Sequence, residues 1–367
     1  MKVVILMPIA EQRGGSELTL LYFMKECKNK KDWLVIFLED GTMVQQIKRF
    51  GIKTKVVEAG RLRNPLKFIS TIKHIIDIAK REKAELIFSW MEKAHIYGGL
   101  VSLLLGINSI WYRRNMPSKS IMDKFITILP TKKIFTNSKT VAKAQDNIWP
   151  KHKIATIHSA VNLEKFNTFK LLTPSKTKKK LKLPKKGQII GIVGRLQKWK
   201  GMHTLIEAMP YILKKYSNAH CVIVGDKHDL EPEYPDYLKN LIKESRLKNK
   251  VTLAGFQTNI SEWMQAMDVV IHASKNEPFG IVIVEAMALG KPVVAGKNGG
   301  PTEIITEGVN GLFAPYGNSK LLAKQILRYL NNPEFSKKIG EAAKKRARDF
   351  STKNYIKKLV NNIKNIK

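Results

Sequence analysis

The sequence predicts an α/β fold made of two Rossmann-like domains, each built on a parallel sheet. Short runs of β-branched residues alternate with amphipathic stretches from the first residue onward, which is typical of parallel strands joined by helices. The alternation breaks once, in a lysine-rich segment at 170–186, and then restarts. A chain of 367 residues is also longer than one ordinary domain of roughly 100–200 residues.

The strand pattern places one sheet in each half of the chain. In the first half we expect strands at 3–7, 33–38, 54–57, 86–89, 110–112, 134–136 and 154–157, and in the second half at 188–193, 220–224, 251–253, 269–272 and 292–295. After Asn318 the pattern is almost wholly helical, with helix starts at Pro333 and Ser351. The predicted domains are 1–165 and 166–349, and a helix at about 350–367 is expected to pack back on the first domain.

The segment 170–186 holds eight lysines and two prolines and comes just after the predicted domain boundary. We expect a solvated linker or a surface hairpin there.

Positive charge dominates the composition. The chain has 65 lysines and arginines against 30 acidic residues, a formal net charge of +35. Nucleic acid, an anionic membrane surface or a phosphorylated substrate would each suit this charge, and so would lysines that only decorate solvated helix faces. The charge is spread over both halves, and no helix-turn-helix, zinc module or RNP-like strand is present. We therefore expect no nucleic-acid partner.

Cysteine usage and hydropathy point to a cytoplasmic protein. Cys27 and Cys221 fall in a predicted helix and a predicted strand, so neither a disulfide framework nor a CxxC metal site is expected. The first apolar run is broken by Pro8 and Glu11 and fits a strand better than a signal sequence. The longest apolar stretch, 98–112, is shorter than the roughly 18 residues of a membrane-spanning helix.

Peripheral docking on the inner face of the cytoplasmic membrane is still open to such a chain. Candidates are the stretches 84–114 and 118–129, the second with Met122, Phe125 and Ile126 beside Lys119 and Lys124. Both stretches fit core helices equally well.

Two glutamates lie eight residues apart, Glu277 and Glu285, with a Pro-Phe-Gly turn between them. Gly280 is expected to open a helix directly after the turn. The backbone N–H groups of Phe279, Gly280 and Ile281 would then point at an anion, and the helix dipole would reinforce them.

A second cluster, Gly194-Arg-Leu-Gln-Lys-Trp-Lys-Gly201, follows a predicted strand. Arg195 and Lys200 could stabilise the negative charge that builds on a diphosphate leaving group. No divalent metal is needed in that case, and no Asp-x-Asp pair at a strand end offers a metal site. The acidic stretch at 231–233 is interpreted as a surface loop.

These motifs resemble those of glycosyltransferase family 4, a family of retaining enzymes with the GT-B fold, in which two Rossmann-like domains face each other across a cleft. The resemblance covers nearly the whole chain. It lies in the Glu-x7-Glu pattern from Glu277 to Glu285, in Ala-Leu-Gly-Lys-Pro-Val-Val at 288–294, in Gly-Gly-Pro-Thr-Glu at 299–303, and in Gly-Arg-Leu…Lys-Gly at 194–201.

The resemblance implies roles for the matching positions. Arg195 and Lys200 would contact the donor diphosphate and, with Glu277 beside the transferred sugar, would form the catalytic set. Glu285 would bind the ribose. The family's base-binding loop is similar to 254–256, which implies donor contacts for Gly255 and Phe256. The turn at 14–15 is similar to the family's glycine turn, so Gly15 would approach the donor phosphate.

Two departures affect the acceptor side. The chain carries Trp-Tyr-Arg-Arg-Asn at 111–115 where many family members have a histidine, so the sugar contact of that histidine would fall to Arg114 or Asn115, or be lost. His95 is a further acceptor-side candidate and could equally be a structural histidine. The family's interdomain Asn-Gly-Val-Asp is here Ser-Ala-Val-Asn at 159–162, which lacks the glycine.

The sequence thus predicts a retaining, metal-independent glycosyltransferase. It would move a hexose-type sugar from a nucleotide diphosphate sugar to a glycan or lipid-linked acceptor in polysaccharide or glycolipid biosynthesis. The expected nucleotide of the donor is UDP or GDP. No bound cofactor or metal is expected. The alternatives are an inactive basic protein that binds nucleic acid or membrane, and a GT-B nucleotide-sugar epimerase.

Overall fold

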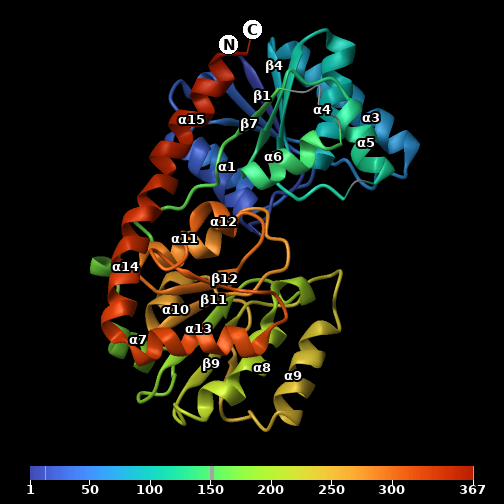
Figure 1. Cartoon of the computed structure of the whole chain (residues 1–367). Coiled ribbons are helices and arrows are strands. Elements are labelled where there is room, and N and C mark those ends of the chain that lie inside the picture. The colour runs from blue at the N-terminus through green and yellow to red at the C-terminus, as the bar shows by residue number, and fades with distance from the viewer. Residues whose placement is uncertain (13, 119, 149–152, 367) are drawn as a thin grey trace. The chain divides into compact units, whose positions relative to one another are not determined.

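The structure is a computed structural model that describes residues 1–12, 14–118, 120–148 and 153–366. The chain forms two compact units (Figure 1). One comprises Met1–Ala160 with Thr352–Lys367, and the other is Val161–Ser351. The sequence prediction divides the chain at 165 and 349.

The first unit is built on a seven-stranded parallel sheet in the order β3-β2-β1-β4-β5-β6-β7. Its strands are β1 (Val3–Met7), β2 (Trp33–Phe37), β3 (Lys53–Val56), β4 (Leu86–Trp90), β5 (Asn108–Arg113), β6 (Lys133–Thr136) and β7 (Ile154–Thr156). Val3 lies opposite Trp33 on one side and Leu86 on the other, so the strand order reverses between β1 and β4.

Helices cover this sheet: α1 (Gly15–Glu26), α2 (Thr42–Arg49), α3 (Pro65–Arg81), α4 (Glu92–Leu105), α5 (Ile121–Ile128), α6 (Lys139–Asp146) and the C-terminal α15 (Thr352–Lys364). Helix α15 contacts α1, and its Tyr355, Leu359 and Ile363 are buried in the core that β1 and β2 line. The last helix therefore belongs to the first unit, because its apolar face packs into the core of that unit.

The second unit has a six-stranded parallel sheet in the order β10-β9-β8-β11-β12-β13. Its strands are β8 (Ile189–Val193), β9 (His220–Val224), β10 (Val251–Leu253), β11 (Val269–His272), β12 (Val293–Gly296) and β13 (Leu312–Ala314). Strand β13 is absent from the sequence prediction. It is three residues long, too short to show a period.

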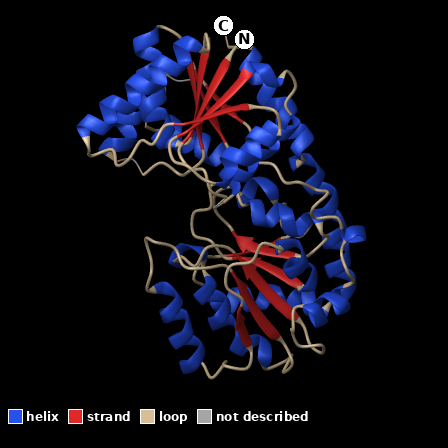
Figure 2. Cartoon of the chain, turned by 180° about the vertical axis from the view of Figure 1, so that it is seen from behind, coloured by secondary structure: helices blue, strands red, loops and turns tan. Residues whose placement is uncertain are grey.

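Helices cover the second sheet as well (Figure 2): α7 (Pro174–Lys180), α8 (Met202–Leu213), α9 (Tyr234–Glu244), α10 (Ile260–Ala266), α11 (Ile281–Ala288), α12 (Pro301–Ile304), α13 (Ser319–Asn331) and α14 (Pro333–Ala347). Short 3₁₀ turns lie at Lys30–Asp32, Thr168–Lys170, Lys198–Lys200 and Arg348–Phe350. Together these elements confirm the predicted α/β fold with two Rossmann-like halves.

The lysine-rich segment 170–186 corrects one expectation, because much of it is helix α7 rather than a linker or hairpin. Pro174 starts the helix, and Thr177 and Lys178 are buried where α7 contacts α10. The Lys178 Nζ donates to Asp268 Oδ2 at 2.9 Å, just before β11. This pair ties α7 to the sheet despite the surrounding lysines.

Both cysteines are free and buried, Cys221 in β9 and Cys27 just after α1. Among the described helices, none combines the length and the hydropathy needed to cross a bilayer.

Candidate functional site

The strand order of the second unit reverses between β8 and β11, which are neighbours. Ligands of open α/β sheets bind outside the carboxyl ends of the strands at such a reversal. The loops that leave these two strands, at 194–201 and 273–280, carry Arg195, Lys200 and Glu277. The fold therefore brings the two strongest sequence motifs to one edge of one sheet.

Glu277 and Lys200 form a largely buried ion pair at this edge. The Lys200 Nζ lies 2.6 Å from Glu277 Oε2, and His272 Nε2 lies 3.2 Å from the same oxygen. Burial alone would raise the pKa of the Glu277 carboxyl, but Lys200 and His272 outweigh burial and hold that pKa well below its ordinary value. Among the described residues no donor occupies Oε1, so the ionised carboxylate has one oxygen left for a ligand.

The Lys200 loop is fixed to the Glu277 loop by backbone contacts. Lys275 N donates to Trp199 O at 2.8 Å. Gly201 has φ +77°, and a Cβ there would lie 2.3 Å from Ala273 O, so this crossing requires glycine. The Lys200 Nζ also lies 4.1 Å from the centroid of the Trp199 ring. The cation is thus held in place before any ligand binds.

Arg195 belongs to the same loop and is exposed. Its Nη1 lies 3.2 Å from His228 Nε2, and the next residue, Leu196, donates its N–H to Asp226 O at 2.8 Å. Unlike Lys200, Arg195 does not contact Glu277. Its guanidinium therefore retains donors for an anion at the edge of the sheet.

Helix α11 begins where the sequence predicts. Gly280 precedes it with φ +103°, and Ile281 is its first residue. The Phe279 side chain is buried and its ring packs on Phe350 at 5.5 Å, so only the Phe279 backbone is available to a ligand.

Glu285 lies in the second turn of α11. Burial raises the pKa of its carboxyl to about 7, and the nearby Lys165 opposes this rise. The two motif glutamates therefore have opposite electrostatics, since the ion pair lowers the pKa of Glu277 and burial raises the pKa of Glu285.

The loop after β12 supports Glu277 from behind. Gly300 N donates to Glu277 O at 2.8 Å. Gly299 has φ +67°, and a Cβ at this position would lie 2.3 Å from Glu277 O. The two glycines let the backbone of this loop approach the backbone of Glu277 closely. This contact fixes the position of the Glu277 side chain.

Gly299→Ala is expected to destabilise the second unit by about 2 kcal/mol more than Gly308→Ala. Both positions have positive φ, but a Cβ at Gly308 meets nothing within 4 Å. The difference therefore isolates the clash with Glu277 O from the backbone strain that both variants share. Urea denaturation of the two variants measures it, and equal losses would show that the 299–277 crossing is loose.

The predicted base-binding loop lies beyond β10. Gly255 has φ +69° with open space around it, and its carbonyl accepts from Gly225 N at 2.9 Å. Phe256 is 67% exposed. An exposed aromatic ring after a glycine turn can stack on a planar group.

The remaining predicted site residues lie in the first unit. They are Gly15, predicted to approach the donor phosphate, and the acceptor-side candidates Arg114, Asn115 and His95. Gly15 is the first residue of α1, and its carbonyl accepts from Arg114 Nη2 at 3.2 Å, while the same nitrogen lies 3.1 Å from Ser159 Oγ. Asn115 donates from Nδ2 to Glu92 Oε2 at 3.1 Å. Gly15, Arg114 and Asn115 therefore share the carboxyl edge of this sheet.

His95 differs from these three residues. It is fully buried on α4, and its ring stacks on Trp111 with centroids 4.6 Å apart. No surface of His95 faces solvent in this arrangement, which favours a packing role.

His272 is the site residue that the sequence interpretation missed. It is the last residue of β11, and the sequence pattern assigns it only to a strand at 269–272. A histidine at the carboxyl end of a strand beside the reversal of strand order was the available signal, because that edge is where side chains meet a ligand.

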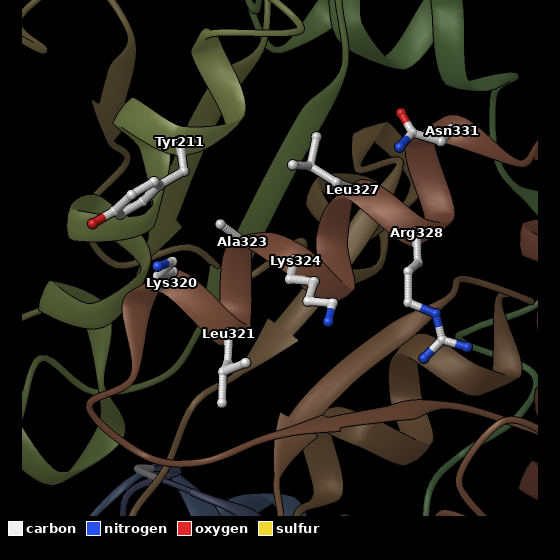
Figure 3. Close-up of a pocket in the computed structure, with 8 residues that line it drawn as sticks. All are labelled: Tyr211, Lys320, Leu321, Ala323, Lys324, Leu327, Arg328 and Asn331. Carbon is white, nitrogen blue, oxygen red and sulfur yellow. The ribbon is translucent and has the colours of Figure 1, made fainter.

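The described residues contain no group of three or more His, Cys, Asp or Glu side chains placed to hold a metal ion. A separate hollow of about 600 Å³ lies between α8 and α13. Figure 3 shows Tyr211 on one side of it and Lys324 and Arg328 along α13. None of the loop residues described above lines this hollow.

Residues 175–346 match the family described as glycosyl transferases group 1. This stretch belongs to that family. The group 1 stretch contains every residue that the sequence predicts to bind the donor except Gly15, and the match confirms the resemblance at the level of the group. The finer assignment to family 4 stays a prediction.

Relatives of this chain include proteins named as glycosyltransferases. An uncharacterized glycosyltransferase of Methanocaldococcus jannaschii is 32% identical over 65% of this chain and 61% of its own length. The lipopolysaccharide core biosynthesis glycosyltransferase LpsE of Rhizobium meliloti is 26% identical over 77% of this chain and 74% of its own. The chain thus spans less than two thirds of the first of these relatives.

Among solved structures, Anabaena HepE in complex with UDP-glucose is similar over 100% of both chains, with a TM-score of 0.88 and 26% identity. The likeness to HepE confirms the predicted GT-B fold class.

Proposed function

We propose that this protein is a retaining, metal-independent glycosyltransferase that uses a nucleotide diphosphate sugar. The observation that carries the proposal is the Glu277 carboxylate, which is held ionised by Lys200 and His272 at the strand reversal and has one free oxygen. A fixed anion beside a fixed cation suits a transition state with positive charge on the sugar and negative charge on the leaving group.

UDP-glucose in the HepE structure supports a uridine donor, and GDP is the alternative that the sequence leaves open. Arg195, Lys200 and the N-terminus of α11 would bind the diphosphate. Glu285 would accept from the ribose hydroxyls, and the loop at 255–256 would hold the base. Gly15 stays a predicted contact to the donor phosphate.

In the proposed reaction the acceptor hydroxyl attacks the anomeric carbon on the same face from which the leaving group departs. The bond from that carbon to the β-phosphate oxygen breaks, and a bond to the acceptor oxygen forms. The departing phosphate oxygen takes the acceptor's proton, so no protein base is needed. Glu277 Oε1 orients the sugar and stabilises its oxocarbenium character, while Lys200 and Arg195 stabilise the nucleoside diphosphate.

The proposed acceptor is a glycan or a lipid-linked sugar, as the name of the LpsE relative suggests. Arg114 and Asn115 are the proposed acceptor-side contacts. We further propose that the protein works at the inner face of the cytoplasmic membrane, where such acceptors are made.

The test is thermal stability in the presence of UDP, GDP, ADP and their sugar conjugates, with and without EDTA. A ligand that binds only the native state raises the apparent melting temperature. UDP and UDP-sugars should do so, and EDTA should not change the shift. Arg195→Gln should weaken UDP binding about tenfold or more, since one charge-assisted contact is lost. Lys239→Gln, which removes an exposed cation on α9 outside the site loops, is the control.

Three results would contradict the proposal. Conversion of the nucleotide sugar without an acceptor would indicate an epimerase. Salt-sensitive nucleic-acid binding without any nucleotide shift would indicate a basic binding protein. A shift that EDTA abolishes would indicate a metal-dependent site.

A further inference from the structure

Helix α5 exposes four large apolar side chains. Ile121 is 87% exposed, Met122 54%, Phe125 50% and Ile128 63%. Their spacing places all four on one stripe of the helix. Another side of α5 already packs against the unit, because Ile126 is buried in its core. The exposed stripe is thus additional to what the fold needs.

Helix α3 continues this apolar surface. Leu66 and Ile69 are largely exposed and flank Phe68. The Phe68 ring lies 5.0 Å from that of Tyr97 on α4 and packs against the small core that contains Ile126 of α5. Helices α3, α4 and α5 therefore lie side by side, as both views of the chain show (Figures 1 and 2).

The exposed charges nearest to Leu66 and Ile69 along the sequence are positive, and the first acidic residue that follows them on α3 is the exposed Asp77. The stretch 61–76 contains Arg61, Arg63, Lys67 and Lys73 and no acidic residue. Arg61 and Arg63 line a hollow of about 440 Å³ with Lys93.

On α5, Lys124 is exposed, whereas Asp123 is buried and pairs with Arg113. Lys119, which the sequence analysis also named, lies outside the described residues.

The surface adjoins the edge that carries the acceptor-side residues. Helix α3 follows β3 and α5 follows β5, so both begin at the carboxyl edge of the sheet, where the acceptor-side candidates Arg114 and Asn115 lie. A lipid bilayer against this surface would present a headgroup to that edge.

We propose that an apolar-basic face, made of Leu66, Ile69, Ile121, Met122, Phe125 and Ile128 with Arg61, Arg63, Lys67 and Lys124, docks on an anionic lipid bilayer. Exposed apolar side chains enter the interface between headgroups and acyl chains, and the surrounding cations bind lipid phosphates. An acidic bilayer matches both properties. This inference deepens the proposed function, on which it rests for the claim that the acceptor is membrane-bound.

The test is sedimentation of the full chain with vesicles of phosphatidylcholine alone and of equal parts phosphatidylcholine and phosphatidylglycerol. Binding should be at least tenfold tighter to the anionic vesicles. Ile121→Ser with Phe125→Ser should weaken it at least tenfold, because two apolar anchors are lost. Arg61→Gln with Arg63→Gln should weaken it about tenfold.

The control variant is Phe169→Ser with Leu230→Ser, since both side chains are strongly exposed but belong to the second unit. It should bind vesicles as the unchanged protein does. The UDP-induced thermal shift is measured on every variant and should stay constant, which also verifies folding.

The results separate the two proposals. A normal UDP shift without vesicle binding overturns the docking face and leaves the proposed function intact. Vesicle binding without any nucleotide shift supports the face and contradicts the function. Equal binding to both vesicle types, an unaltered affinity of the Ile121/Phe125 variant, or a dimer that this variant dissociates would each overturn the docking face.

Discussion

Glu277→Gln is expected to lower the rate of sugar transfer by about 100-fold or more. The amide can still accept a hydrogen bond from Lys200 and keeps the shape of the side chain, but it no longer carries the negative charge that the transition state requires. UDP affinity should change little, because the carboxylate faces the sugar in the proposed complex. The measurement is kcat with a UDP-sugar, together with the Kd of UDP from titration.

The control is Glu307→Gln, which removes a partly exposed carboxylate that pairs with Lys297 at 3.4 Å in the same unit. It should leave kcat unchanged. A Glu277→Gln enzyme with a full transfer rate and normal UDP binding would remove Glu277 from the mechanism, and with it the role we give to its free oxygen. Loss of UDP binding in that variant would instead assign Glu277 to the diphosphate side.

The central strands of both sheets could be predicted from local sequence because they are buried on both faces. Runs such as Val3–Met7 and His220–Val224 are fully buried, and the structure has them with the predicted bounds. Strand β13 and helix α7 could not be predicted in the same way. Strand β13 depends on its pairing with β12, and α7 is anchored by the contact of Lys178 with Asp268, about 90 positions away in the sequence.

The site shows the same division between local and long-range information. Motif spacing was enough to single out Glu277 and Lys200, but the ion pair between them joins two loops that only the strand order brings together. The local pattern around His272 predicts only a strand, because its contact with Glu277 also depends on the fold. His95 shows the opposite case, because nothing in its local sequence reveals that Trp111 covers it.

Glu285→Gln is expected to stabilise the protein at pH 8 by up to about 3 kcal/mol. Burial raises the Glu285 pKa from 4.5 to about 7, so the unfolded chain ionises at a lower pH than the native state does. The contribution of this carboxyl to stability is therefore complete below about pH 4.5, declines as the pH rises to about 7, and is then constant. Glutamine cannot ionise, and the variant should lose this decline.

Urea denaturation between pH 4 and pH 8 measures the free energy of unfolding of the variant and of the unchanged protein. The titrations of all other groups cancel in the difference between these two free energies. Glu244→Gln, at an exposed position at the end of α9, is the control. The same substitution should weaken UDP binding about tenfold, since the proposed acceptor of the ribose hydroxyls is lost. A carboxyl kept in the donor site at a cost in stability is what a functional role predicts. A Glu285→Gln protein that is no more stable at pH 8 and binds UDP normally would contradict both the burial argument and the ribose contact.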